Sequence, residues 1–190
     1  MKFKKLSILF CSLLALTSVM AVSAAETETV SETEAASAEE STVSGADEET
    51  EYPITIQHAY GETVIESKPE RIATVGWENQ DAPLALGIAP VGVSAANYGM
   101  VTENNLHPWT DEAFQELGVD APNVFDDVDG LDFEAISDCD PDVILASYSG
   151  LTQEDYDTLS QIAPVIPYKE NAWQTTWRDQ TIENAEGMGM

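Results

Sequence analysis

The chain has 190 residues, enough for one domain with a sizeable hydrophobic core, and a formal net charge of −28. All 35 acidic residues lie after residue 25, where only four basic residues remain: Lys68, Arg71, Lys169 and Arg178. Because such an acidic surface repels nucleic acid and anionic membranes, neither is expected as a partner.

The first 25 residues have the pattern of a secretory signal peptide. Three lysines within the first five residues precede a mostly apolar stretch, 6–22, and small residues suited to cleavage follow it. This stretch is short for a membrane span, so we expect a cleaved signal and a protein exported to the periplasm or the cell surface. Cys11 lies inside the apolar stretch, after bulky Phe10, so a lipid anchor is not expected.

An acidic segment, residues 26–51, follows the predicted signal peptide. It holds neither an aromatic nor a basic residue, so it cannot bury enough apolar surface to offset the entropy of ordering, and we expect a disordered linker. Beyond residue 25, Cys139 is the only cysteine, which excludes an intramolecular disulfide. The folded part, which we place at residues 52–190, must therefore depend on its hydrophobic core.

Two kinds of pattern follow one another in the folded part. Residues 52–67 alternate apolar and polar on both sides of a turn at 59–62, which predicts a β-hairpin. After it, short apolar strands alternate with short helices. Strands are predicted over 71–77, 89–95, 123–127, 142–147 and 164–168. Helices are predicted over 81–87, 110–118, 132–138, 152–163 and 175–187.

The predicted helices carry recognisable start signals. Asp81 and Thr110 stand where a capping side chain is expected, a helix is predicted to begin at Asp132, and Thr152 with Asp155 forms a capping pair. The alternation of apolar strands with helices indicates an α/β fold, in which a parallel sheet is flanked by helices on both faces.

Polar, aromatic and glycine residues gather where the predicted strands end. In open α/β sheets, ligands bind beyond the carboxyl ends of the parallel strands. Glycines let the backbone approach a ligand, and aromatic side chains offer rigid contact area. Any one of these aromatic residues, taken alone, fits a core-capping role as well, but the convergence of four loops favours a cleft for a sizeable organic ligand. The candidate ligand-binding residues are Trp77, Asn79, Gln80, Tyr98, Ser147, Tyr148, Ser149, Tyr168 and Trp173.

Catalytic and metal-binding alternatives have weaker support. Ser147 and Ser149 suggest a hydrolase, but "ASYSG" lacks the G-x-S-x-G turn, and a nucleophilic serine needs a positioned base. The two histidines, His58 and His107, lie away from the predicted strand ends and lack local metal-ligand spacing. We therefore expect a binding protein rather than an enzyme, with no cofactor and no metal site.

Two segments resemble a known family. They are "YPITIQHAYGETVIESKPERIATVGWENQDAPLALGIAPVGVSAANYG" and "GLDFEAISDCDPDVILASYSGLTQEDYDTLSQIAPVIPY". The second contains a short helix with a glutamate, a P-D-x-I-x strand and a helix leading to an A-P-V strand. In order and spacing, these segments resemble the first lobe of the ferric-siderophore solute-binding proteins of bacterial ABC transporters. They cover most of residues 52–187.

The resemblance implies a monomeric, two-lobed extracytoplasmic receptor that hands an iron chelate to a membrane permease and its ATPase. The chelator carries the iron, and the ligand lies between two α/β lobes joined by a long helix. By position, the residues that would line the first lobe's half of the cleft are Trp77, Tyr98, Tyr148, Ser149 and Trp173. Glu134 would dock with arginines of the permease, although the helix dipole also favours an acidic residue in a first helical turn.

The family continues into a second lobe, so we expect this chain to hold the first lobe alone, with the second lobe absent, and to bind its ligand weakly. Lys169 is the only basic residue in the strand-end loops, which favours a neutral or cationic hydroxamate-type complex over an anionic catecholate. A haem or cobalamin receptor and a secreted protein-interaction domain remain alternatives, and a serine hydrolase is the least favoured.

Overall fold

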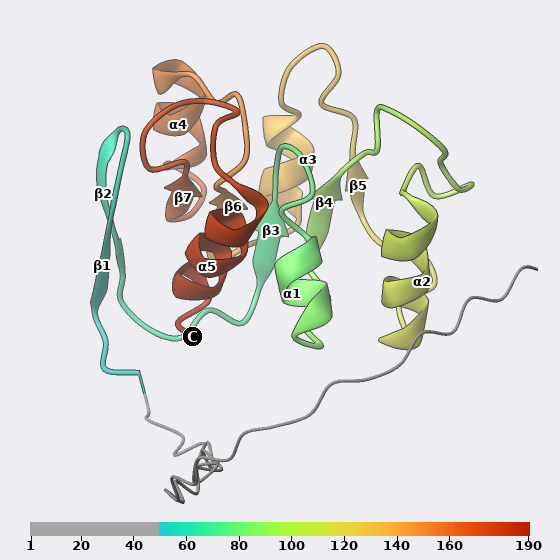
Figure 1. Ribbon diagram of the computed structural model, residues 1–190, viewed down its shortest axis with the longest axis horizontal. Helices are drawn as coiled ribbons and strands as arrows, with labels where there is room; N and C mark the ends of the chain where they lie inside the picture. The colour runs from blue at the N-terminus through green and yellow to red at the C-terminus, as the bar shows by residue number, and fades with distance from the viewer. Residues whose placement is uncertain (1–49) are drawn as a thin grey trace, which may run out of the picture. The chain divides into compact units, whose positions relative to one another are not determined.

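Residues 50–190 are described by a computed structural model (Figure 1). The predicted signal peptide, and the predicted linker up to residue 49, lie outside the described residues. The described part begins with a β-hairpin of β1 (Ile54–His58) and β2 (Gly61–Ile65), paired antiparallel. The hairpin predicted over 52–67 is therefore confirmed.

Five parallel strands form the main sheet, as predicted. Their order is β5-β4-β3-β6-β7, so β3 lies in the centre and pairs with both β4 and β6. Every strand is shorter than predicted, by at least one residue at each end. The strands are β3 (Ile72–Thr74), β4 (Gly92–Ser94), β5 (Val124–Phe125), β6 (Val143–Ala146) and β7 (Val165–Pro167).

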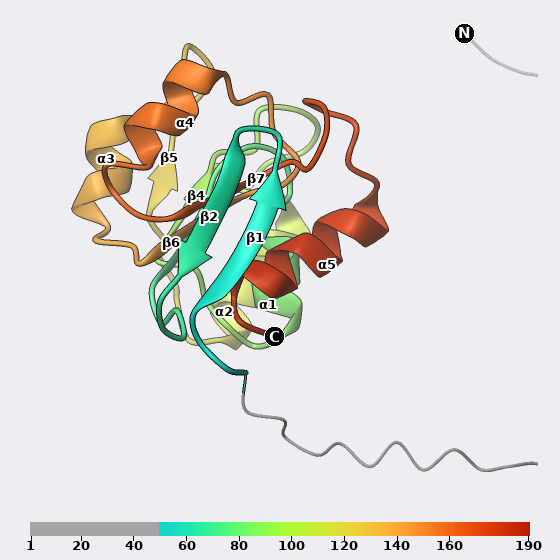
Figure 2. The same cartoon turned by 90° about the vertical axis from the view of Figure 1, so that its left-hand side faces the viewer.

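Helices cover both faces of this sheet (Figure 2). On one face lie α3 (Phe133–Asp138) and α4 (Gln153–Leu159). On the other lie α1 (Asp81–Ala85), α2 (Pro108–Glu116) and α5 (Trp177–Gly187). The strand residues that separate the two layers are almost fully buried, as in α/β folds with covered parallel sheets.

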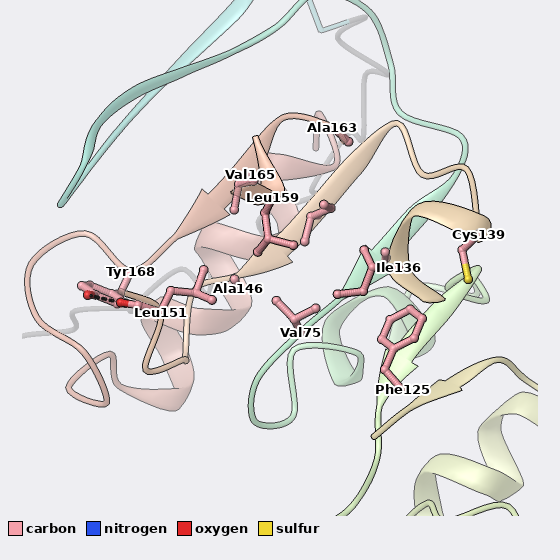
Figure 3. Packing of buried hydrophobic residues seen from close by; sticks show 12 residues of the cluster. Val75, Phe125, Ile136, Cys139, Ala146, Leu151, Leu159, Ala163, Val165 and Tyr168 are labelled. Atoms are coloured by element: carbon pink, nitrogen blue, oxygen red, sulfur yellow. Dashed lines mark hydrogen bonds between the residues drawn. The ribbon is translucent and has the colours of Figure 1, made fainter. Parts of the chain in front are cut away.

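The core on the α3 and α4 face reaches the loops at the carboxyl ends of the strands. Ile136 and Leu159 pack with Ile144 and other buried strand residues in one cluster. Figure 3 shows this cluster extending to Leu151 and Tyr168, beyond β6 and β7. The loops at this edge are therefore anchored to the hydrophobic core.

The helix starts confirm some predicted caps and correct others. Asp132 accepts a hydrogen bond from the Ala135 N–H at 2.9 Å, and Thr152 with Asp155 forms a full capping box. The predicted caps Asp81 and Thr110 are wrong, because each lies inside its helix. α2 begins earlier, at Pro108, whose fixed φ suits the first helical position. No helix within residues 50–190 is long and apolar enough to cross a membrane.

Candidate functional site

A cavity of about 520 Å³ lies at the carboxyl edge of the main sheet. We call it the carboxyl-edge cavity. Residues that follow β3, β4, β5 and β6 line it, together with the loop between β7 and α5. These loops lie along the upper edge of the sheet in Figure 1. The cleft predicted at the strand ends is therefore present as a cavity in the described part of the chain.

Backbone hydrogen bonds hold the cavity loops against one another. The Trp77 N–H donates to the Tyr148 carbonyl at 3.0 Å, and the Trp173 N–H donates to the Ser149 carbonyl at 3.1 Å. Gly76 makes the first contact possible, since its φ is +84° and a Cβ there would lie 2.8 Å from the Tyr148 carbonyl oxygen. The loops are thus fixed before any ligand arrives.

Two of the predicted aromatic residues line the cavity. Trp77 is partly buried and Trp173 is 53% exposed. Tyr148 stands behind Trp173 in an edge-to-face contact, with 5.4 Å between ring centroids. Two tryptophans in the lining of one cavity are typical of a site for a sizeable organic ligand.

Asn79 and Ser147, two predicted ligand-binding residues, lie inside the protein instead. Neither side chain is exposed, and neither lines the carboxyl-edge cavity. The Asn79 side-chain N–H groups donate to the Val75 carbonyl at 2.8 Å and the Tyr148 carbonyl at 3.1 Å. Asn79 Oδ1 and the Ser147 hydroxyl are both within hydrogen-bonding distance of the Asn184 amide on α5. This network ties the ends of β3 and β6 to α5.

Three further predicted residues also lie away from the cavity. Gln80 is 5% exposed and borders only a small neighbouring space of about 10 Å³. The Tyr168 hydroxyl donates to the Leu151 carbonyl at 2.9 Å from within the core. Tyr98 is 78% exposed on the loop after β4, outside the cavity lining. These three residues lie near the carboxyl ends of the strands, as predicted, but they do not line the carboxyl-edge cavity.

Ser149 lines the cavity, yet its hydroxyl is already bonded. It donates to the Ala146 carbonyl at 2.7 Å. Within residues 50–190, neither Ser147 nor Ser149 hydrogen-bonds to a histidine. The hydrolase alternative therefore has no positioned base beside either serine in that range.

Glu134, the predicted docking residue, is exposed in the first turn of α3. It is not among the residues that line the carboxyl-edge cavity. Within residues 50–190, no group of three or more His, Cys, Asp and Glu side chains is arranged to hold a metal ion.

Sequence reasoning missed Asp127, which follows β5 and lines the cavity. The Ser94 hydroxyl donates to Asp127 Oδ2 at 2.5 Å, and Ser94 Oγ in turn accepts from the Gly76 N–H at 3.0 Å. Burial raises the pKa of the Asp127 carboxyl above its usual value, although the Ser94 hydrogen bond works in the opposite direction. The acidic pair at the end of the predicted strand 123–127 was the available signal.

A second cavity of about 580 Å³ lies between β1 and the end of α5. It is lined by residues such as Ile54, Ile56 and Gly189. None of the predicted site residues lines it. The loops that carry the predicted site thus converge on the carboxyl-edge cavity.

The chain is similar to known proteins. Residues 72–189 match a protein family described as "Periplasmic binding protein". A curated relative, the "Probable siderophore-binding lipoprotein YfiY" of Bacillus subtilis (strain 168), is 29% identical over 172 residues. That alignment covers 86% of this chain and 43% of the relative.

The chain is also similar to solved structures. Streptococcus pneumoniae TIGR4 PiaA in complex with ferrichrome is 56% identical, with a TM-score of 0.69, covering 72% of this chain and 45% of PiaA. Staphylococcus aureus SirA complexed with staphyloferrin B is 28% identical, with a TM-score of 0.57, covering 72% of this chain and 42% of SirA. The chain spans less than half the length of each of these relatives.

Proposed function

Because the chain belongs to the periplasmic binding protein family, we propose that it forms the first lobe of an extracytoplasmic receptor for a ferric siderophore. The receptor delivers this complex to an ABC importer, through its permease and ATPase. One observation carries the proposal: Trp77 and Trp173 line one cavity at the carboxyl edge of a chain that is 56% identical to a ferrichrome-bound protein.

The cavity chemistry suits a complete metal chelate. A siderophore supplies all the ligands of its iron, so the protein needs no metal-binding side chains and only has to contact the organic shell. Trp77 and Trp173 offer apolar faces for that shell. Since backbone bonds already fix both loops, little conformational entropy is lost when the ligand binds.

The proposed domain organisation has three parts. Residues 1–25 are a signal peptide, residues 26–51 a linker, and residues 52–190 the first lobe. The match to less than half of PiaA supports a two-lobed receptor. One lobe contacts one side of the ligand, so we expect this chain alone to bind weakly.

The importer is the proposed partner. A PiaA structure of Streptococcus pneumoniae TIGR4, 53% identical to this chain, carries the description "iron uptake ABC transporter substrate-binding protein". Glu134 is the docking residue that we propose on this lobe, because it is exposed in the first turn of α3 and lies outside the cavity lining. A carboxylate at this position leaves the cavity free for the ligand and can pair with an arginine of the permease.

Calorimetric titration of the 190-residue chain with ferrichrome tests the proposal. We expect saturable binding with a dissociation constant of about 1 µM or weaker, and weaker binding still for Trp77→Ala. Trp177→Ala is the matched control, since Trp177 is exposed on α5 and does not line the cavity. No saturable heat at millimolar ferrichrome contradicts the receptor function, whereas a submicromolar constant contradicts the single-lobe proposal.

A further inference from the structure

The carboxyl-edge cavity carries acidic charge without basic charge. Its ionisable lining residues are Asp127 and Asp155, and none of the residues that line it is lysine, arginine or histidine. A cavity with this lining disfavours an anionic guest, because no cation compensates the two carboxylates.

The basic side chains within residues 50–190 are held elsewhere. Arg71 donates to the Asp140 carbonyl, at the amino edge of the sheet, and Lys68 lies in the segment just before it. Lys169 pairs with Glu186 at 3.2 Å, and Arg178 lies over the Trp177 ring. None of these groups is therefore placed to neutralise the cavity.

Of the two carboxylates, Asp155 is the one that belongs to a helix capping box. Asp155 Oδ2 accepts from both the backbone N–H and the hydroxyl of Thr152, at 2.9 and 2.7 Å, as part of the capping box. Asp127 accepts one side-chain hydrogen bond, from Ser94. Burial also raises the Asp127 pKa, so its ionised form carries a desolvation cost that an incoming cation would offset.

From this arrangement we propose that Asp127 is a specificity-determining residue, which selects iron chelates with a cationic or N–H-donating group over anionic ones. Asp127 pairs with that group at the cavity wall, while Trp77 and Trp173 contact the apolar shell. The inference rests on the proposed receptor function and adds the charge class of its ligand.

Two ferric chelates that differ in one charge test the inference. The ferric complex of desferrioxamine B carries a free terminal ammonium, and its N-acetylated form is neutral but otherwise the same. We expect the 190-residue chain to bind the ammonium form about tenfold more tightly, the size of a charge-assisted hydrogen bond. In Asp127→Asn, which keeps an acceptor for Ser94, this ratio should fall to about one or two. Urea unfolding shows whether Asp127→Asn is folded, and the ratio compares the two chelates within one and the same variant.

Asp129→Asn is the matched control, because it removes the same charge from the same loop at a residue that does not line the cavity. It should keep the wild-type ratio. Equal binding of both chelates by the wild type, or a ratio that survives in Asp127→Asn, overturns the inference while the receptor function stands. If the chain binds neither complex and no ferrichrome, the receptor function itself is wrong.

Discussion

The indole ring of Trp173 occupies the space that a side chain on Gly150 would need. A Cβ at Gly150 would lie 2.5 Å from Trp173 Nε1 and 2.7 Å from Trp173 Cε2. Gly150 lies in the loop between β6 and α4, Trp173 lies in the loop between β7 and α5, and both line the carboxyl-edge cavity. The glycine therefore sets where this wall of the cavity stands.

Gly150→Ala should push the Trp173 ring out of its position. We expect ferrichrome affinity to fall about tenfold, because one aromatic face moves away from the ligand. Stability should change by less than about 1 kcal/mol, since an exposed ring can move without opening the core. Calorimetric titration and urea unfolding measure the two effects. Wild-type affinity in the variant would show that the position of Trp173 does not matter for binding.

Asn79→Ala should destabilise the fold by about 3 kcal/mol, because it leaves several buried partners without hydrogen bonds. The Val75 carbonyl would lose the Asn79 donor, and the Tyr148 N–H would lose Asn79 Oδ1 as its acceptor. The Tyr148 carbonyl and the Asn184 amide would each lose one hydrogen bond and keep another. Urea unfolding measures the change. Asn97→Ala is the control, since Asn97 is exposed and its substitution should cost less than about 0.5 kcal/mol. A small effect for Asn79→Ala would restore a direct ligand-binding role as the better explanation of this residue.

Glu183 on α5 should make stability depend on pH. It is 4% exposed, its Oε2 has no hydrogen-bond partner within residues 50–190, and burial raises its pKa from 4.5 to about 7. Because the folded-state pKa is the higher one, the folded protein holds the proton more tightly. This contribution to stability is full at low pH and is lost as pH rises from 4.5 through 7.

Glu183→Gln mimics the protonated carboxyl and should therefore stabilise the protein by about 2 kcal/mol at pH 8, with little effect at pH 5. Thermal unfolding at both pH values measures this difference. Glu186→Gln is the control, because Glu186 pairs with the same Lys169 but is 44% exposed. If Glu183→Gln has the same effect at pH 5 and pH 8, the carboxyl does not titrate between them.

Glu134→Gln, introduced into the gene of the native host, should slow the uptake of iron from ferrichrome several-fold. The ligand affinity of the variant protein should stay unchanged, because Glu134 does not line the cavity. Glu154→Gln, an exposed glutamate in the first turn of α4, is the matched control and should leave uptake unaltered. Equal uptake rates in both variants would remove Glu134 from the docking surface.

Sequence patterns predicted the fold well, because its signals are local. The Thr152–Asp155 capping box and the apolar run of β6 each depend on a few adjacent residues. The start of α2 was misplaced because two start signals compete there. Thr110 is a good capping residue, but Pro108 is also a favourable first helical residue, and the helix begins at Pro108. Local chemistry thus decided most of the elements, and competing local signals account for the errors.

The site was predicted only in part, since the direction of a side chain at a strand end depends on distant contacts. Trp77, Ser149 and Trp173 line the cavity as expected. Asn79 turns inward because its partners include Asn184, which lies 105 residues further along the chain. Asp127 was missed because its neighbours Ser94 and Gly76 come from two other strands. Such contacts appear only once the sheet order is known.

The most direct test of the receptor proposal follows the four tryptophan indole N–H signals in an NMR titration with the gallium complex of ferrichrome. Gallium(III) replaces iron without paramagnetic broadening, and weak binding gives signals that move with ligand concentration. We predict saturable shifts for Trp77 and Trp173, which line the carboxyl-edge cavity, and none for Trp177 on α5. Shifts confined to Trp177, or no shifts at millimolar ligand, would contradict binding in this cavity.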